Sequence, residues 1–136
     1  LDLRARRQSE NALAVGKAIE GRVARMLHPG LASHPQHNLA KSQMDACGPI
    51  FAFGLPGGAE QAMSFLNTLE LVDISNNIGD SRSLCCHPWT TTHYGLSPDV
   101  RRDMGVREGL LRINIGLEDP RDVVADLEQA LTKVGL

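Results

Sequence analysis

The stretch Leu110-Leu-Arg-Ile-Asn-Ile-Gly-Leu117 decides the fold, because aliphatic side chains occupy every second position along it. Successive side chains of an extended chain point to opposite faces, so this alternation predicts a β-strand. One face belongs against an apolar core, and the other face carries Arg112 and Asn114. The core-facing set consists of Leu111, Ile113, Ile115 and Leu117.

A helix is predicted on the C-terminal side of this strand. Asp119 and Pro120 are typical of a helix start, and Asp122 places a negative charge in the first turn, where the helix dipole favours it. Apolar residues then recur at spacings typical of one helix face. That stripe consists of Val123, Val124, Leu127, Leu131 and Val134.

Strands and helices also alternate on the N-terminal side. Phe51, Phe53 and Leu55 alternate with small residues, which predicts a second strand over residues 50–55. A helix follows it, and residues 71–75 form another expected strand. The apolar stripe of that helix consists of Ala59, Ala62, Met63, Leu66 and Leu69.

Proline, glycine and serine positions define three further segments. A short helix is expected over residues 36–44, and residues 84–97, rich in Thr, His and Pro, are predicted to form a long loop. Ser97 opens a helix over residues 100–104, which Gly105 ends.

The first 27 residues show a helical pattern without a visible beginning. No capping residue precedes Leu1, and the chain lacks an initiator Met. We therefore expect residues 1–27 to be part of a long helix that enters the domain, and the chain to be cut from a longer protein. The stripe of this helix consists of Ala12, Val15, Ile19, Val23 and Met26.

Composition limits the fold and the function classes. The 136 residues suffice for one domain with a mainly aliphatic core, since the chain has only three Phe, one Trp and one Tyr. A net charge of −2 argues against a broad nucleic-acid surface, and no apolar run is long enough to span a membrane. The three cysteines indicate a reducing compartment, which predicts a cytoplasmic protein. The expected fold class is α+β: an antiparallel or mixed sheet with helices on one face.

Histidine and cysteine residues raise the possibility of a metal site, which their spacing does not favour. Zinc ligands usually come in pairs separated by two to four residues, and adjacent cysteines do not supply that spacing. We expect no metal site, structural histidines and two buried thiols, and no Gly-x-Ser-x-Gly hydrolase elbow is present. The residues concerned are His34, His37, Cys85, Cys86, His87 and His93.

Arg112 and the polar stretch after residue 75 are candidates for anion binding. A guanidinium on a rigid strand can hold a carboxylate through two parallel hydrogen bonds, but spacing alone favours a surface arginine on a solvated sheet face. The segment Asn76-Asn77-Ile-Gly-Asp80 could likewise present donors to an anion or form a simple turn.

Three ordered blocks of sequence resemble the Cys/Met-metabolism family of pyridoxal-phosphate enzymes. They are Asn77-Ile-Gly-Asp-Ser-Arg-Ser-Leu84, Cys86-His-Pro-Trp-Thr-Thr-Thr-His93 and Gly109-Leu-Leu-Arg-Ile-Asn-Ile-Gly-Leu-Glu-Asp119. The similarity continues through His28–Leu31, Ser33–His37 and Asp126–Leu131, and so extends over essentially the whole chain.

The resemblance implies that this chain is a C-terminal domain. Residues 28–136 would be the substrate-binding domain of a fold-type I enzyme, and the N-terminal domain that holds pyridoxal phosphate would be absent. In the family that domain carries the Schiff-base lysine, whereas the lysines here are Lys17, Lys41 and Lys133, none in a Ser-x-Thr-Lys context. We therefore expect no catalytic or cofactor-binding residue in this chain and no activity from it alone.

The resemblance assigns roles to two residues. Arg112 matches the arginine that holds the α-carboxylate of the amino-acid substrate, and Asn77 matches the position that helps to bind it. Asn77 and Arg82 favour the homoserine-ester sulfhydrylases, closest to the O-succinylhomoserine type, over cystathionine γ-synthases and γ-lyases. Two departures from the family pattern, Trp89 and Cys86, lie in the loop near the substrate.

The implied reaction is the conversion of O-succinylhomoserine and sulfide to homocysteine, within a homo-oligomer that is a tetramer in the family. The sequence leaves two alternatives open. One is a cystathionine γ-synthase or γ-lyase, and the other is a stand-alone packing or assembly module without catalysis.

Overall fold

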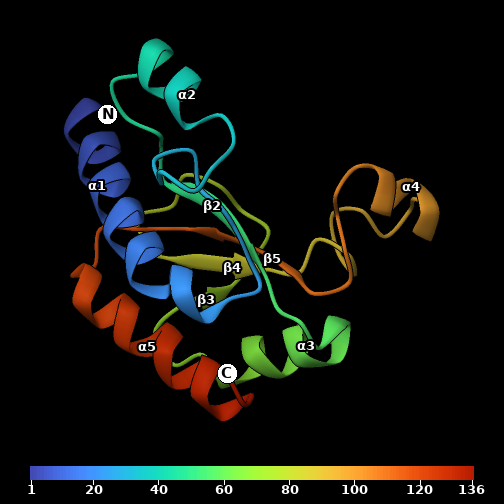
Figure 1. Ribbon diagram of the computed structural model, residues 1–136. Helices are drawn as coiled ribbons and strands as arrows, with labels where there is room; N and C mark the ends of the chain where they lie inside the picture. The colour runs from blue at the N-terminus through green and yellow to red at the C-terminus, as the bar shows by residue number, and fades with distance from the viewer.

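A five-stranded mixed sheet runs through the molecule in the order β1-β2-β5-β4-β3. The computed structural model describes residues 1–136 (Figure 1). The central strand β5 pairs antiparallel with β2 and β4, β1 pairs antiparallel with β2, and β3 pairs parallel with β4. This arrangement confirms the predicted mixed sheet. The strands are β1 (Arg25–Leu27), β2 (Ile50–Gly54), β3 (Asp73–Ile74), β4 (Leu84–Cys86) and β5 (Leu110–Asn114).

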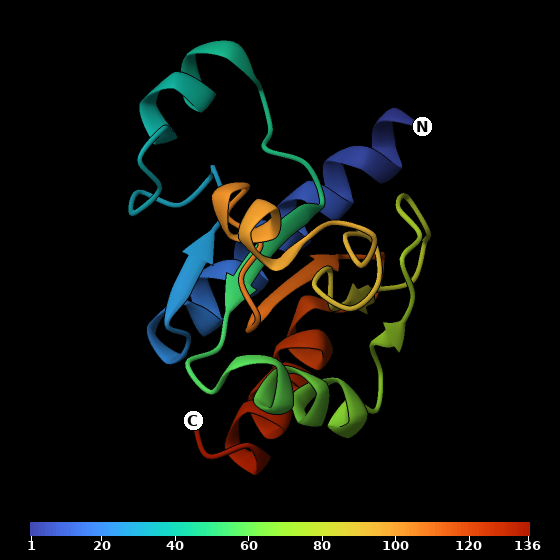
Figure 2. The ribbon, with the colours of Figure 1, turned by 90° about the vertical axis from the view of Figure 1, so that its right-hand side faces the viewer.

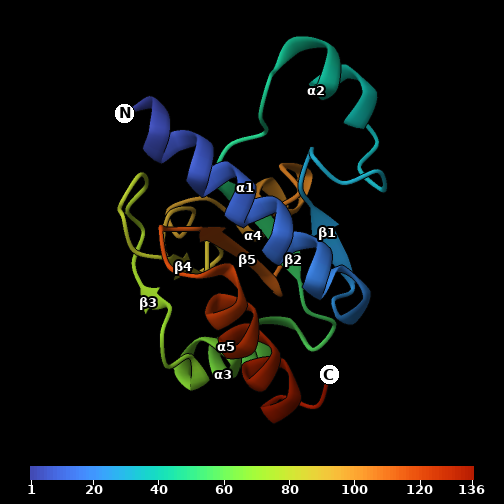
Figure 3. The same cartoon turned by 90° about the vertical axis from the view of Figure 1, so that its left-hand side faces the viewer.

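Three of the five α-helices cover one face of the sheet, which gives the predicted α+β sandwich. Figure 3 shows α1 and α5 in front of the strands, and α3 packs below them. The other two helices lie outside this layer, and Figure 2 shows the connection that carries α4 on the opposite side of the sheet from α1. No helix is long and apolar enough to cross a bilayer. The helices are α1 (Asp2–Ile19), α2 (His37–Gln43), α3 (Gly58–Thr68), α4 (Pro98–Asp103) and α5 (Pro120–Lys133).

The core lies between the sheet and these three helices. Leu111, Ile113 and Ile115 are fully buried, as their alternation predicted. Phe53 packs edge-on against Phe65 of α3, with 5.7 Å between ring centroids. Around these rings the core is almost entirely aliphatic, and burial of that apolar area is the main term that stabilises the fold.

The ends of two predicted elements are wrong. The first helix ends at Ile19 instead of residue 27, and after a 3-10 turn the chain forms β1, in which Met26 pairs with Phe53. Strand pairing gives these backbone groups partners along the edge of β2, so tertiary contact overrides the helical pattern. The strand β5 ends at Asn114, and Leu117 beyond it is 42% exposed.

Two further predictions are corrected by burial. Residues 84–86, expected in a loop, form β4, in which each residue is buried between β3 and β5. A strand buried on both faces shows no alternation, so its sequence resembles a loop. On α3 the fully buried residue is Phe65, whereas Met63 of the predicted stripe is 41% exposed.

Asp126 on α5 is a buried carboxylate that organises the turn after α3. Its oxygens accept hydrogen bonds from the backbone N–H groups of Glu70 at 2.8 Å, and of Leu71 and Val72 at 2.9 Å. Burial by itself raises the pKa of this carboxyl, but these N–H donors and Gln129 more than offset that effect and hold the pKa below its usual value. The carboxylate therefore fixes the path of the chain into β3.

Replacing Asp126 with Ala should destabilise the protein by about 3 kcal/mol in urea unfolding at pH 7, because three buried donors lose their acceptor. The matched Asp126→Asn variant keeps one acceptor oxygen and should lose less. Since the folded-state pKa of Asp126 is depressed, the stabilisation is present above the unfolded pKa of about 3.9 and is lost as the pH falls through the folded value. A difference between wild type and Asp126→Asn that stays constant down to acid pH would contradict this account.

Candidate functional site

Arg112 lies in the middle of the central strand, on the sheet face opposite to the aliphatic core. Its neighbours across the sheet are Ala52 in β2 and Cys86 in β4. The half-buried guanidinium donates from Nη2 to the backbone carbonyl of Asn76 at 2.7 Å, and it hydrogen-bonds to no other oxygen. None of the ion pairs in the molecule involves Arg112. The guanidinium therefore lies on a rigid strand without a carboxylate partner, which leaves N–H donors that are not paired with a carboxylate.

Asn77 follows directly after the residue that Arg112 contacts. Its side chain is exposed and makes no hydrogen bond, while its backbone N–H donates to Ser75 Oγ at 3.2 Å. The contact between Arg112 and Asn76 therefore places the two residues singled out by sequence in one neighbourhood, although they are far apart in the chain.

The loop of residues 76–83 is tied to the chain that extends beyond β5. The Gly79 N–H donates to Asn114 Oδ1 at 3.2 Å, and the Leu117 N–H donates to the Ser81 carbonyl at 2.8 Å. At Gly116 a Cβ atom would collide with the Ser81 carbonyl, so only glycine permits this close approach of the two backbones. The loop consequently follows the position of β5.

Ser83 and Glu118 close the end of this loop. The Glu118 carboxylate accepts from the Ser83 N–H at 2.7 Å and from the Ser83 hydroxyl at 2.9 Å. The same hydroxyl accepts from the Gly116 N–H at 2.9 Å, and Ser83 is fully buried. This closed network fixes the entrance to β4.

Two polar residues on the buried face of α1 hold this loop and the chain just after β5, and the sequence reasoning missed them. Gln8 Nε2 donates to the carbonyls of Asp80 at 2.8 Å and Ile115 at 2.9 Å. Asn11 Nδ2 donates to the carbonyls of Gly116 at 3.1 Å and Glu118 at 3.0 Å. The spacing of these two residues could have revealed them, because Gln8, Asn11 and Ala12 lie on the same face of α1.

The adjacent cysteines point to opposite faces of β4, as alternation requires. Cys85 belongs to the core, where burial raises the pKa of its thiol. Burial also raises the pKa of Cys86, although Arg112 beside it acts in the opposite direction. Both thiols are free and buried, which confirms the prediction of small apolar residues and keeps them protonated at neutral pH.

The loop after β4 is organised by Arg101, which the sequence reasoning also missed. Its guanidinium is buried and donates to the carbonyls of Trp89 at 3.0 Å, Tyr94 at 2.6 Å and Leu96 at 2.8 Å. The cation also lies 4.6 Å from the centre of the Trp89 ring. The Trp89 ring therefore packs against the Arg101 guanidinium. Trp89, one of the two departures from the family pattern, thus has a defined contact in the fold.

His87 is a structural residue. It is buried, and its ring nitrogens contact Thr90 Oγ1 at 2.9 Å and the Glu108 carbonyl at 2.6 Å. The histidine and cysteine side chains do not gather with carboxylates into a group of three or more that could hold a metal.

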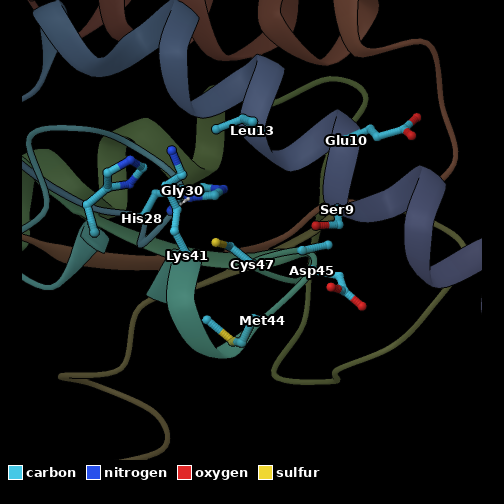
Figure 4. Close-up of a pocket in the computed structure, with 11 residues that line it drawn as sticks. Ser9, Glu10, Leu13, His28, Gly30, Lys41, Met44, Asp45 and Cys47 are labelled. Atoms are coloured by element: carbon cyan, nitrogen blue, oxygen red, sulfur yellow. Dashed lines mark hydrogen bonds between the residues drawn. The ribbon is translucent and has the colours of Figure 1, made fainter. Parts of the chain in front are cut away.

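A cavity of about 380 Å³ lies between α1 and the segment that contains α2. Figure 4 shows Ser9 and Leu13 on the α1 side and Lys41 and Met44 on the α2 side. Arg112 does not line this cavity, so the cavity and the candidate anion site are separate places.

The lysines lie away from the candidate site. Lys17 and Lys133 belong to α1 and α5, which cover the opposite face of the sheet from Arg112, and Lys133 pairs with Glu70 at 3.3 Å. Lys41 lies on α2 beside the cavity. The three lysines are thus spread over α1, α2 and α5 and do not gather at Arg112.

Known proteins similar to this chain are much longer than it is. An L-methionine gamma-lyase from Treponema denticola is 39% identical over 98% of this chain and 34% of its own length. An O-succinylhomoserine sulfhydrylase from Mycobacterium tuberculosis is 38% identical over 97% of this chain and 34% of its own length. This chain thus spans about a third of the curated relatives that it matches.

A solved structure and a family model agree with these relatives. A Campylobacter jejuni protein assigned as an O-acetylhomoserine (thiol)-lyase, solved with N'-pyridoxyl-lysine-5'-monophosphate, superposes with a TM-score of 0.92 and 32% identity over 96% of this chain and 32% of its own. The model of the Cys/Met metabolism PLP-dependent enzymes matches residues 1–132. This match and the relatives show that the chain belongs to the Cys/Met metabolism PLP-dependent enzyme family.

Proposed function

We propose that this chain is the C-terminal, substrate-binding domain of a cytoplasmic homoserine-ester sulfhydrylase that depends on pyridoxal phosphate. The reaction proposed for the whole protein is the conversion of O-succinylhomoserine and sulfide to homocysteine, within a homo-oligomer. One observation carries the role of this chain: the half-buried guanidinium of Arg112 has no carboxylate partner within it.

The fixed position of Arg112 makes it a specific anchor for a carboxylate. Its single hydrogen bond to the Asn76 carbonyl restrains the guanidinium while leaving other N–H donors for a ligand. An α-carboxylate would also gain from the exposed amide of Asn77 on the adjoining loop. Charge-assisted hydrogen bonds of this kind are shorter and about twice as strong as neutral ones.

The chemical contribution of this domain is orientation. Pyridoxal phosphate, held by other residues of the whole enzyme, acts as an electron sink for carbanions. Pinning the carboxylate fixes the direction of the Cα–H bond of the substrate, which lowers the entropic part of the barrier to proton removal. Arg112 and Asn77 thus bind and align the substrate, and the proton is moved by a group outside this chain.

Replacing Arg112 with Ala in the full-length enzyme should lower kcat/KM by about 100-fold or more, because the carboxylate loses its charged partner. The Arg112→Lys variant keeps the charge without the planar fork and should recover part of the loss. Steady-state kinetics with O-succinylhomoserine and sulfide measure both effects. An unchanged kcat/KM in Arg112→Ala would refute the assignment of this residue.

Two residues of the 76–83 loop favour the sulfhydrylase over other members of the family. Asn77 and Arg82 belong to the Asn-Ile-Gly-Asp-Ser-Arg-Ser-Leu block that resembles homoserine-ester sulfhydrylases. Arg82 pairs with Asp73 of β3 at 2.8 Å and lies 3.8 Å from Asp80, so a basic residue at this position braces the loop. A glutamate at this position, as in cystathionine enzymes, would bring a third negative charge beside these two carboxylates.

The choice of nucleophile separates the candidate functions. Incubation of the full-length protein with O-succinylhomoserine should yield homocysteine with sulfide, and little cystathionine with cysteine. A preference for cysteine would favour a cystathionine γ-synthase, and breakdown of cystathionine or methionine without an acceptor would favour a γ-lyase. The remaining candidate is a non-catalytic assembly module. Absence of turnover with every one of these substrates would support that candidate.

A further inference from the structure

We propose that Asn114 is a positioning residue that holds Asn77 in register with Arg112. This inference rests on the proposed function, since it assigns to Asn114 the task of placing one of the two carboxylate-binding residues. Asn114 itself is 1% exposed and does not contact the substrate in this account.

The surroundings of Asn114 show that its amide serves the loop. Its neighbours across the sheet are Ile50 in β2 and Leu84 in β4, both apolar. Within this apolar setting its Oδ1 accepts from the Gly79 N–H at 3.2 Å, while its buried Nδ2 has no partner. An unpartnered amide donor in an apolar setting destabilises the fold, so an aliphatic side chain would suit packing better. What the amide provides is the contact with the loop.

Asn77 lies between two attachment points on the same strand. Arg112 holds the carbonyl of Asn76, and Asn114 holds the N–H of Gly79, so the intervening backbone is fixed at both ends. Residues 112 and 114 are two apart on β5 and therefore share a face. Strand β5 carries both Arg112 and Asn114, which hold the two ends of this backbone segment. Asn77 therefore moves with Arg112.

The remaining supports of the loop do not replace Asn114. Gln8 holds the Asp80 carbonyl and Leu117 holds the Ser81 carbonyl, and both of these lie beyond Gly79. Arg4 contacts the Gly79 carbonyl from the exposed end of α1. Gly79 has a φ of +82°, a conformation open to glycine that does not restrain the chain by itself. Loss of the Asn114 acceptor should therefore loosen residues 77–79 while the rest of the loop stays in place.

The test uses the full-length enzyme and a double-mutant cycle. Asn114→Ala should raise KM about 10-fold with a smaller change in kcat, and Asn77→Ala should give a loss of similar size. If Asn114 acts through Asn77, the double variant is no worse than the poorer single variant, because contacting residues are not additive. Asn67→Ala, which removes an exposed amide on α3, is the matched control and should leave the kinetics unchanged. If Asn114→Ala does not fold, Asn114→Ser takes its place.

Hydrogen exchange supplies a readout that does not depend on activity. The Gly79 amide should exchange about 10-fold faster in Asn114→Ala than in wild type, and stay slow in Asn114→Asp, which keeps an acceptor oxygen. Unchanged exchange, or kinetic losses that multiply in the double variant, would overturn the inference and leave the proposed function standing. If Asn77→Ala alone has no effect, the proposed role of Asn77 fails, and the inference fails with it.

Discussion

The antiparallel pairing of β5 with both of its neighbours is the constraint on which the rest of the structure depends. It places β5 at the centre of the sheet, so one side of the strand must face the helices and the other must face away. Leu111 and Ile113 use the first side to complete the core, and Arg112 and Asn114 use the second. Core packing and the proposed substrate site thus use alternate residues of one strand. A shift of one residue in the register of β5 would turn each of its side chains to the other face of the sheet. The Arg112 guanidinium would then lie in the core.

The loop of residues 76–83 depends on the same strand through polar contacts instead of apolar packing. Its carbonyl and N–H groups find partners on β5, on the chain just after β5 and on the buried face of α1. Gly116 permits this arrangement because any side chain there would meet the Ser81 backbone. Because buried polar groups must be partnered, this network specifies one loop conformation, and so one position for Asn77 relative to Arg112.

Local patterns in the sequence predict the elements that meet the core on one side only. The strand that contains Arg112, the helix that begins at Asp119 and the fold class itself follow from such patterns. Strand β4 is buried on both faces and carries no alternation, and the end of α1 is decided by pairing of β1 with β2, which is a long-range contact. The strand pattern made Arg112 and the stretch after residue 75 candidates for anion binding, and the family resemblance assigned roles to Arg112 and Asn77.

The polar residues that hold the loops and turns in place were not predictable in the same way. Gln8, Arg101 and Asp126 each bind backbone groups far away in the chain or in an irregular loop. Their side-chain types are common on protein surfaces, so a sequence pattern does not distinguish a buried one from an exposed one. Only the fold shows which backbone groups need a partner.

The most direct test of the account compares a substrate carboxylate with its primary amide. Full-length wild-type enzyme should turn over O-succinylhomoserine with a kcat/KM about 100-fold or more above that of the α-carboxamide analogue, because only the carboxylate pairs with a guanidinium. In Arg112→Ala this preference should nearly vanish, since both substrates then lack the charged partner. A preference that survives the substitution undiminished would show that another group holds the carboxylate, and would contradict the central claim.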